Sequence, residues 1–134
     1  MVSPATADAL NSLTSIIISA AIGIHRTFGP GLLEHAYLAC LCHELKSAGL
    51  GIEVQKALPL IYRGVKIDCV YRADLIVERV VLVEVKAIDI LSPFHGKQLN
   101  TYLRLGEYPV GLLLNFGAPT MKEGIKRIVN GFPS

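Results

Sequence analysis

Three charged residues stand close together in or beside a strongly apolar stretch in the middle of the chain. Asp74 precedes the segment VVLVEVK, which contains Glu84 and Lys86 two positions apart. Because side chains in a strand alternate between its two faces, Glu84 and Lys86 point to the same side. Burying an unpaired carboxylate or ammonium costs several kcal/mol, so this pattern in a buried strand requires a compensating partner.

Two explanations fit these charges. The first is a structural ion pair between Glu84 and Lys86 near the end of the strand. The second is a divalent cation held by Asp74 and Glu84 from adjacent strands, since hard cations prefer oxygen ligands, with the carbonyl of Val85 as a further ligand. The cation would lower the pKa of a bound water, and Lys86 would orient that water or stabilise charge on a reacting phosphate.

The turn between the two carboxylates distinguishes the possible registers. A two-residue turn (78–79) would pair Asp74 with Val83 and place Asp74 and Glu84 on opposite faces. A three-residue loop (78–80) places Asp74 directly opposite Glu84 on the same face. Like charges facing each other destabilise a strand pair unless a cation lies between them. The functional interpretation therefore predicts the three-residue loop.

Two helical segments carry further candidate site residues. In GPGLLEHAY, Glu34 and Tyr37 are three residues apart and share a helix face, so Glu34 offers a third carboxylate from outside the sheet. In QLNTY, Gln98 and Tyr102 are four apart and also share a face, on a helix that follows Lys86 closely. The alternative for Gln98 and Tyr102 is an ordinary half-exposed helix face.

Basic and aromatic residues near these motifs are candidates for contacting nucleic acid. Arg72, on the same strand face as the first carboxylate, and Lys97 are candidates for phosphate contacts. Tyr37 is a further candidate nucleic-acid-binding residue. His25 and His95 also lie near the motifs and could approach the site, but surface or helix-packing roles are favoured for both.

Apolar periodicity and turn residues predict the order of the elements. The predicted order is helix, helix, antiparallel strands, helix, strand, helix, which indicates an α/β sandwich with a mixed sheet. The predicted helices cover residues 6–27, 30–49, 92–105 and 121–130, and the predicted strands cover 52–56, 58–63, 65–77, 80–86 and 108–116.

Composition limits the class of protein without identifying a function. A length of 134 residues fits one domain, 1–134, and 51% hydrophobic with 18% charged residues is typical of a globular chain. The net charge of +2 does not by itself argue for nucleic-acid binding. The apolar run SIIISAAIGI is too short to span a bilayer and follows no Lys or Arg, so we expect a cytoplasmic protein without membrane contact. Cys40, Cys42 and Cys69 are expected to be core thiols, with no disulfide or zinc site.

Several of these segments together resemble a known family. GPGLLEHAY is similar to the signature of the GxxExxY proteins, and YRADLIV, VEVKA, QLNTYL and GLLLNFG follow in the same order and at similar spacing. That group belongs to the PD-(D/E)xK nuclease superfamily, and the resemblance covers about residues 17–128. It implies a restriction-endonuclease-like three-layer α/β sandwich, with a central mixed sheet flanked by helices. It also implies site roles: Asp74 and Glu84 as metal ligands, Lys86 as the catalytic lysine, Glu34 as the helix-borne acidic residue, and Gln98 with Tyr102 as a QxxxY pair.

The resemblance and the residue chemistry predict a Mg²⁺- or Mn²⁺-dependent nuclease. It would hydrolyse phosphodiester bonds of DNA, with RNA as the other candidate substrate, through a metal-activated water. The alternative is a non-catalytic module of the same fold that binds nucleic acid or protein as a subunit of a repair or defence assembly. The chain leaves no room for a separate target-recognition domain, so a homodimer or a partner protein is expected. A small-molecule enzyme is disfavoured, because there is no glycine-rich phosphate loop.

Overall fold

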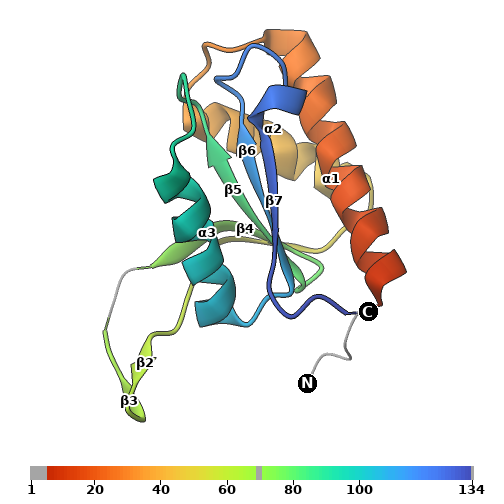
Figure 1. Ribbon diagram of the computed structural model, residues 1–134. Helices are drawn as coiled ribbons and strands as arrows, with labels where there is room; N and C mark the ends of the chain where they lie inside the picture. The colour runs from red at the N-terminus through yellow and green to blue at the C-terminus, as the bar shows by residue number, and fades with distance from the viewer. Residues whose placement is uncertain (1–5, 69–70, 134) are drawn as a thin grey trace.

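A five-stranded mixed sheet forms the centre of the computed structural model, which describes residues 6–68 and 71–133 (Figure 1). β5 and β6 are parallel, and the other neighbouring pairs are antiparallel. In spatial order the strands are β1 (Ile52–Ala57), β4 (Arg72–Val77), β5 (Val81–Lys86), β6 (Val110–Asn115) and β7 (Ile125–Val129). The predicted α/β fold with a central mixed sheet is confirmed.

Helices cover both faces of this sheet. α1 (Ala7–Phe28) and α2 (Glu34–Ser47) pack on one face, and α3 (Pro93–Gly106) packs on the other (Figure 1). The alternation of side chains along β5 explains how one strand serves both layers, because Val83 belongs to the α1–α2 core and Leu82 belongs to the α3 core. Glu84, two residues after Leu82, therefore lies on the α3 face. The three-layer arrangement places the charged residues of β4 and β5 under α3.

α1 is a core helix with an unusually apolar composition. The Thr6 side chain caps its start by accepting a hydrogen bond from the Ala9 backbone N–H at 3.1 Å. By length and composition alone, the 22-residue helix could cross a membrane. The apolar run SIIISAAIGI considered in the sequence analysis is only part of this helix, so it underestimated the length of the apolar segment. Residues along its buried side, including Ile17 and Ala21, nevertheless pack against α2 and the sheet. A buried core helix meets the same length and composition criterion.

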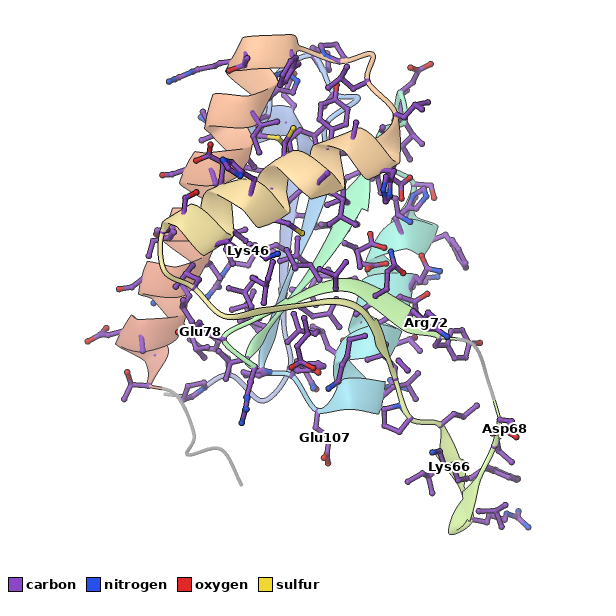
Figure 2. All side chains as sticks on the ribbon, turned by 180° about the vertical axis from the view of Figure 1, so that it is seen from behind. Lys46, Lys66, Asp68, Arg72, Glu78 and Glu107 are labelled. Carbon is purple, nitrogen blue, oxygen red and sulfur yellow. The ribbon has the colours of Figure 1, made fainter. Side chains whose placement is uncertain are left out.

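The segment between β1 and β4 differs from the prediction of a short strand at 58–63 and a longer strand at 65–77. It contains only the short strands β2 (Ile61–Tyr62) and β3 (Val65–Lys66), which pair with each other in a separate two-stranded hairpin. Residues 69 and 70, inside the predicted strand 65–77, lie outside the described residues. Arg63 and Gly64 both have positive φ angles (50° and 77°), so the turn expected there is present and closes the hairpin. The hairpin extends away from the sheet, with Lys66 and Asp68 on it (Figure 2).

The closing helix predicted for residues 121–130 is wrong. Lys122–Gly124 forms a single 3₁₀ turn, and β7 follows and pairs antiparallel with β6. Met121, Ile125 and Ile128 are spaced as on a helix, but β6 would otherwise expose its backbone hydrogen-bonding groups at the edge of the sheet. Pairing with β6 satisfies those groups, so the tertiary context overrides the local pattern.

The cysteine prediction is tested for two of the three residues. Cys40 and Cys42 are free and half-buried on α2, and both pack against the α1–α2 core. Cys69 lies outside the described residues. The two described cysteines therefore contribute to packing.

Candidate active site

The register of the β4–β5 hairpin brings the two carboxylates together. Val77 pairs with Val81, which leaves residues 78–80 as a three-residue loop, two of them with positive φ angles of 51° and 63°. The predicted loop length is confirmed. The same register places Asp74 opposite Glu84 on the face covered by α3.

The two strands separate just before the carboxylates, and the side chains replace the missing backbone contacts. Leu75 and Val83 are the last paired residues of the ladder. Beyond them, Glu84 Oε2 accepts a hydrogen bond from the Asp74 N–H at 2.7 Å, and Asp74 Oδ2 accepts one from the Val85 N–H at 2.8 Å. Each carboxylate is thus fixed by the backbone of the neighbouring strand. This exchange orients both groups at the point where the sheet opens.

The two carboxylates are electrostatically strained. Glu84 is only 5% exposed, and its burial together with the charge of Asp74 raises the pKa of Glu84 to about 8. Burial also raises the pKa of Asp74, while the Val85 N–H and the charge of Lys86 act in the opposite direction. A facing acidic pair with raised pKa values is the environment in which a bound cation gives a large electrostatic gain.

Lys86 does not form the simple ion pair with Glu84. In the described part of the chain, Lys56 and Glu53 form the only salt bridge within 4.0 Å, at 2.6 Å. Lys86 is half-buried at the end of β5, and its positive charge lowers the pKa of both Asp74 and Glu84. The ammonium therefore acts on the pair as a whole, and the ion-pair explanation is not supported.

Glu34 lies at the start of α2 and is exposed. Its negative charge contributes to the raised pKa of Glu84, although less than the charge of Asp74 does. The helix begins at Glu34 and not at Pro30 as predicted, because Gly31 has a φ of +125° that a helix does not allow. The loop before α2 therefore places Glu34 in the first helical turn, on the side of the acidic pair.

The expected convergence of three carboxylates is not found. Across residues 6–68 and 71–133, no group of three or more His, Cys, Asp or Glu side chains is arranged to hold a metal ion. The donors that fit a hard cation are the carboxylates of Asp74 and Glu84 and the carbonyl of Val85 between Glu84 and Lys86. Their oxygen chemistry fits Mg²⁺ or Mn²⁺, and Glu34 is a neighbouring acidic group.

Tyr37 has a structural position instead of a surface one. Its ring is fully buried and stacks on Phe116 with ring centroids 4.5 Å apart. Its hydroxyl donates to the Gly29 carbonyl and accepts from the Leu32 N–H. Tyr37 thereby fixes the loop that leads into Glu34. Because its ring does not reach solvent, Tyr37 is not positioned for the nucleic-acid contact for which it was a candidate.

The QxxxY pair lies on α3, and the two basic candidates lie on β4 and α3. Gln98 Nε2 donates to the Tyr102 hydroxyl at 3.3 Å, so the two residues share a face of α3 as their spacing predicts. The Tyr102 ring also packs against Tyr71, three residues before Asp74, with centroids 5.9 Å apart. Arg72 and Lys97 are exposed, and Arg72 lies at the start of β4 (Figure 2).

Both histidines near the motifs have packing or capping roles, as expected. His25 is buried, and its Nε2 lies 2.9 Å from the Ala118 carbonyl oxygen. His95 Nδ1 accepts a hydrogen bond from the Ser92 N–H at 3.0 Å and completes the capping box at the start of α3. Neither contact involves the acidic pair.

Asn115 is a positioning residue that sequence reasoning missed. It is buried at the end of β6, where its Oδ1 accepts from the Ile88 N–H at 3.0 Å and its Nδ2 donates to the Ile88 carbonyl at 2.9 Å. These bonds hold the loop that follows Lys86. Gly117 allows the approach, since a Cβ there would lie 2.2 Å from the Ile88 oxygen. The available signal was a single polar residue ending the apolar run GLLLN.

The fold is an α/β domain with a mixed sheet between helix layers, and two carboxylates and a lysine lie where its central strands separate. The sequence matches the family model of the PD-(D/E)XK nuclease superfamily over residues 11–128. The chain belongs to this superfamily, whose members are typically metal-dependent. Searches of curated proteins and of solved structures found no match. Membership of the narrower GxxExxY group stays a prediction.

Proposed function

We propose that the protein is a Mg²⁺- or Mn²⁺-dependent nuclease that hydrolyses phosphodiester bonds of DNA, with RNA as the other candidate substrate. The observation that carries this proposal is the facing pair of Asp74, which is half-buried, and Glu84, which is buried. Two carboxyl groups fixed opposite each other, with the pKa of Glu84 raised to about 8, would carry uncompensated negative charge if both were ionised. A divalent cation would offset that charge.

The cation would be held by Asp74, Glu84 and the Val85 carbonyl, with Glu34 next to them. A bound divalent cation supplies positive charge that lowers the pKa of water and polarises a phosphoryl group. The open strand ends leave the carboxylates facing the gap between β4 and β5 beyond Leu75. The site residues are thus oriented before any substrate binds.

Other residues of the chain would position the substrate and stabilise charge. Lys86, half-buried beside the pair, would orient the attacking water or stabilise negative charge that develops on the phosphate. Gln98 and Tyr102 offer polar groups from α3 above the same face. The exposed side chains of Arg72 and Lys97 would contact phosphates on either side of the scissile one.

The alternative function is a non-catalytic module that binds nucleic acid or a partner protein, within a repair or defence assembly. One observation favours it: the described residues offer two carboxylates in contact and no cluster of three. Fewer anionic ligands give a weaker cation site. A homodimer is compatible with either function.

Calorimetry with Mg²⁺ and Mn²⁺ tests the proposal at its first step. We expect wild-type protein and Glu44→Gln, an exposed carboxylate on α2, to bind the cation, and Asp74→Asn and Glu84→Gln to lose binding. Cleavage of labelled single-stranded and duplex DNA and of RNA should follow the same pattern, and Lys86→Met should retain binding without cleavage. Wild-type protein that binds nucleic acid but neither binds the cations nor cleaves would establish the alternative.

A further inference from the structure

The three most exposed large apolar side chains of the described residues all belong to segments that border the candidate active site. Ile90 is 82% exposed, Leu33 is 80% exposed and Phe94 is 65% exposed. We call these three residues the apolar rim. Large apolar side chains grouped on a surface mark a binding site more often than chance exposure does.

The rim comes from two loops and the first turn of α3. Leu33 directly precedes Glu34, Ile90 lies between Lys86 and α3, and Phe94 is in the first turn of α3. The loop from α1 to α2 and the loop from β5 to α3 lie next to each other where β5 ends, in both views (Figures 1 and 2). The rim residues therefore belong to segments that meet at the end of the strand that carries Glu84.

The exposure of the rim is not the result of loosely held backbone. The loop before Leu33 is fixed by the buried Tyr37 hydroxyl, and both backbone groups of Ile88, two residues before Ile90, are bonded to Asn115. The helix start that carries Phe94 is held by its capping box. Rigid backbone that presents apolar side chains to solvent is preorganised for a ligand.

The chemistry of the rim selects one part of a nucleic acid. Leu, Ile and Phe side chains gain nothing from phosphates, and a duplex presents mainly phosphates and sugars on its outside. Base faces become accessible only in unpaired nucleotides, where they stack on aromatic and apolar side chains. A second copy of the chain docked on the rim would instead cover Glu34 and Lys86 and close the candidate site.

We propose that the apolar rim binds unpaired bases next to the scissile phosphate, so that the substrate is a single strand or a single-stranded end. This inference rests on the proposed nucleic-acid function and adds the strand preference. Phe94 stacks on a base, while Ile90 and Leu33 contact neighbouring bases from the two loops. Arg72 and Lys97 contact the phosphates of the same nucleic-acid strand.

Fluorescence anisotropy in EDTA, which prevents cleavage, tests the rim by comparing a labelled single strand with a blunt duplex of the same sequence. We expect wild-type protein to prefer the single strand. Phe94→Ser and Ile90→Ser should each weaken single-strand binding about tenfold, equivalent to about 1.4 kcal/mol, and leave duplex binding unchanged. Ile16→Ser, the same type of substitution at an exposed position of α1, should bind as wild type does.

Further measurements separate the failure of the inference from the failure of the proposed function. Unchanged melting temperatures of the two rim variants would exclude a folding defect, and a fluorescent base analogue should lose its quenching in Phe94→Ser.

A preference for duplex, or rim variants that bind the single strand normally, would overturn the rim proposal while cleavage could still support a nuclease. Self-association of wild-type protein that Phe94→Ser abolishes would also overturn it. Rim-dependent binding without cleavage in Mg²⁺ or Mn²⁺ would support the rim and refute the nuclease.

Discussion

Replacing Glu84 by Gln should stabilise the metal-free protein at alkaline pH. The raised pKa of Glu84, about 8 against an ordinary value of 4.5, means that the folded state favours the neutral carboxyl. The contribution of neutral Glu84 to the free energy of unfolding is fully present below pH 4.5 and is lost as pH rises through 8. Burial and the charges of Asp74 and Glu34 raise the pKa of Glu84. The hydrogen bond from the Asp74 N–H and the charge of Lys86 lower it. Gln keeps an oxygen acceptor for the Asp74 N–H and cannot ionise.

The size of the effect follows from the two pKa values. At 1.36 kcal/mol per pKa unit, the interval from 4.5 to 8 corresponds to about 5 kcal/mol once Glu84 is fully ionised, above about pH 9. Small domains have total stabilities of about 5–15 kcal/mol, so this is a large fraction. Most of the loss should occur between pH 5 and pH 8.

Chemical denaturation in EDTA at a series of pH values measures this effect directly. We expect the free energy of unfolding of the wild type to fall from about pH 5 to about pH 9, and that of Glu84→Gln to fall less in the same interval, because only Asp74 of the pair can still ionise. Glu44→Gln, at an exposed position, should follow the wild type. Mg²⁺ should restore wild-type stability at alkaline pH and leave Glu84→Gln unchanged. Equal losses of stability in wild type and Glu84→Gln would refute the argument that burial keeps Glu84 neutral.

Two further changes test the elements that position the site. Tyr37→Phe removes the hydroxyl bonds to the Gly29 carbonyl and the Leu32 N–H, so we expect a loss of about 1–3 kcal/mol in denaturant titrations and reduced cleavage; an unchanged stability would contradict the structural role of Tyr37. Gly117→Ala places a Cβ 2.2 Å from a backbone oxygen and should destabilise the protein, whereas Gly23→Ala, with open space around it on α1, should stabilise it by up to about 1 kcal/mol; equal melting temperatures for the two variants would contradict this contrast.

The sequence predicted the central part of the candidate site because the relevant rules are local. Alternation along β5 placed Glu84 and Lys86 on one face. The functional interpretation, in which a cation lies between facing carboxylates, predicted the three-residue loop that the register confirms. The roles of Gln98 and Tyr102 in catalysis stay predictions, although their shared helix face follows from their spacing.

The parts that sequence reasoning missed depend on contacts between distant segments. Residues 121–130 fit a helical period, and only the unpaired edge of β6 makes them a strand. The motif around Glu34 identified Tyr37 as notable, but its burial depends on stacking against Phe116, which comes from the far end of the chain. No local pattern contains that information.

The exchange of side-chain and backbone partners at the end of the β4–β5 hairpin has a dynamic consequence. The amide protons of Asp74 and Val85 are protected by carboxylate oxygens, whereas those deeper in the ladder are protected by backbone carbonyls. A cation that withdraws electron density from these oxygens weakens the hydrogen bonds that they accept from the two amides. Hydrogen exchange at Asp74 and Val85 would therefore change with the ionic composition of the solvent, while the rest of the ladder would keep the rate set by the packing of the core.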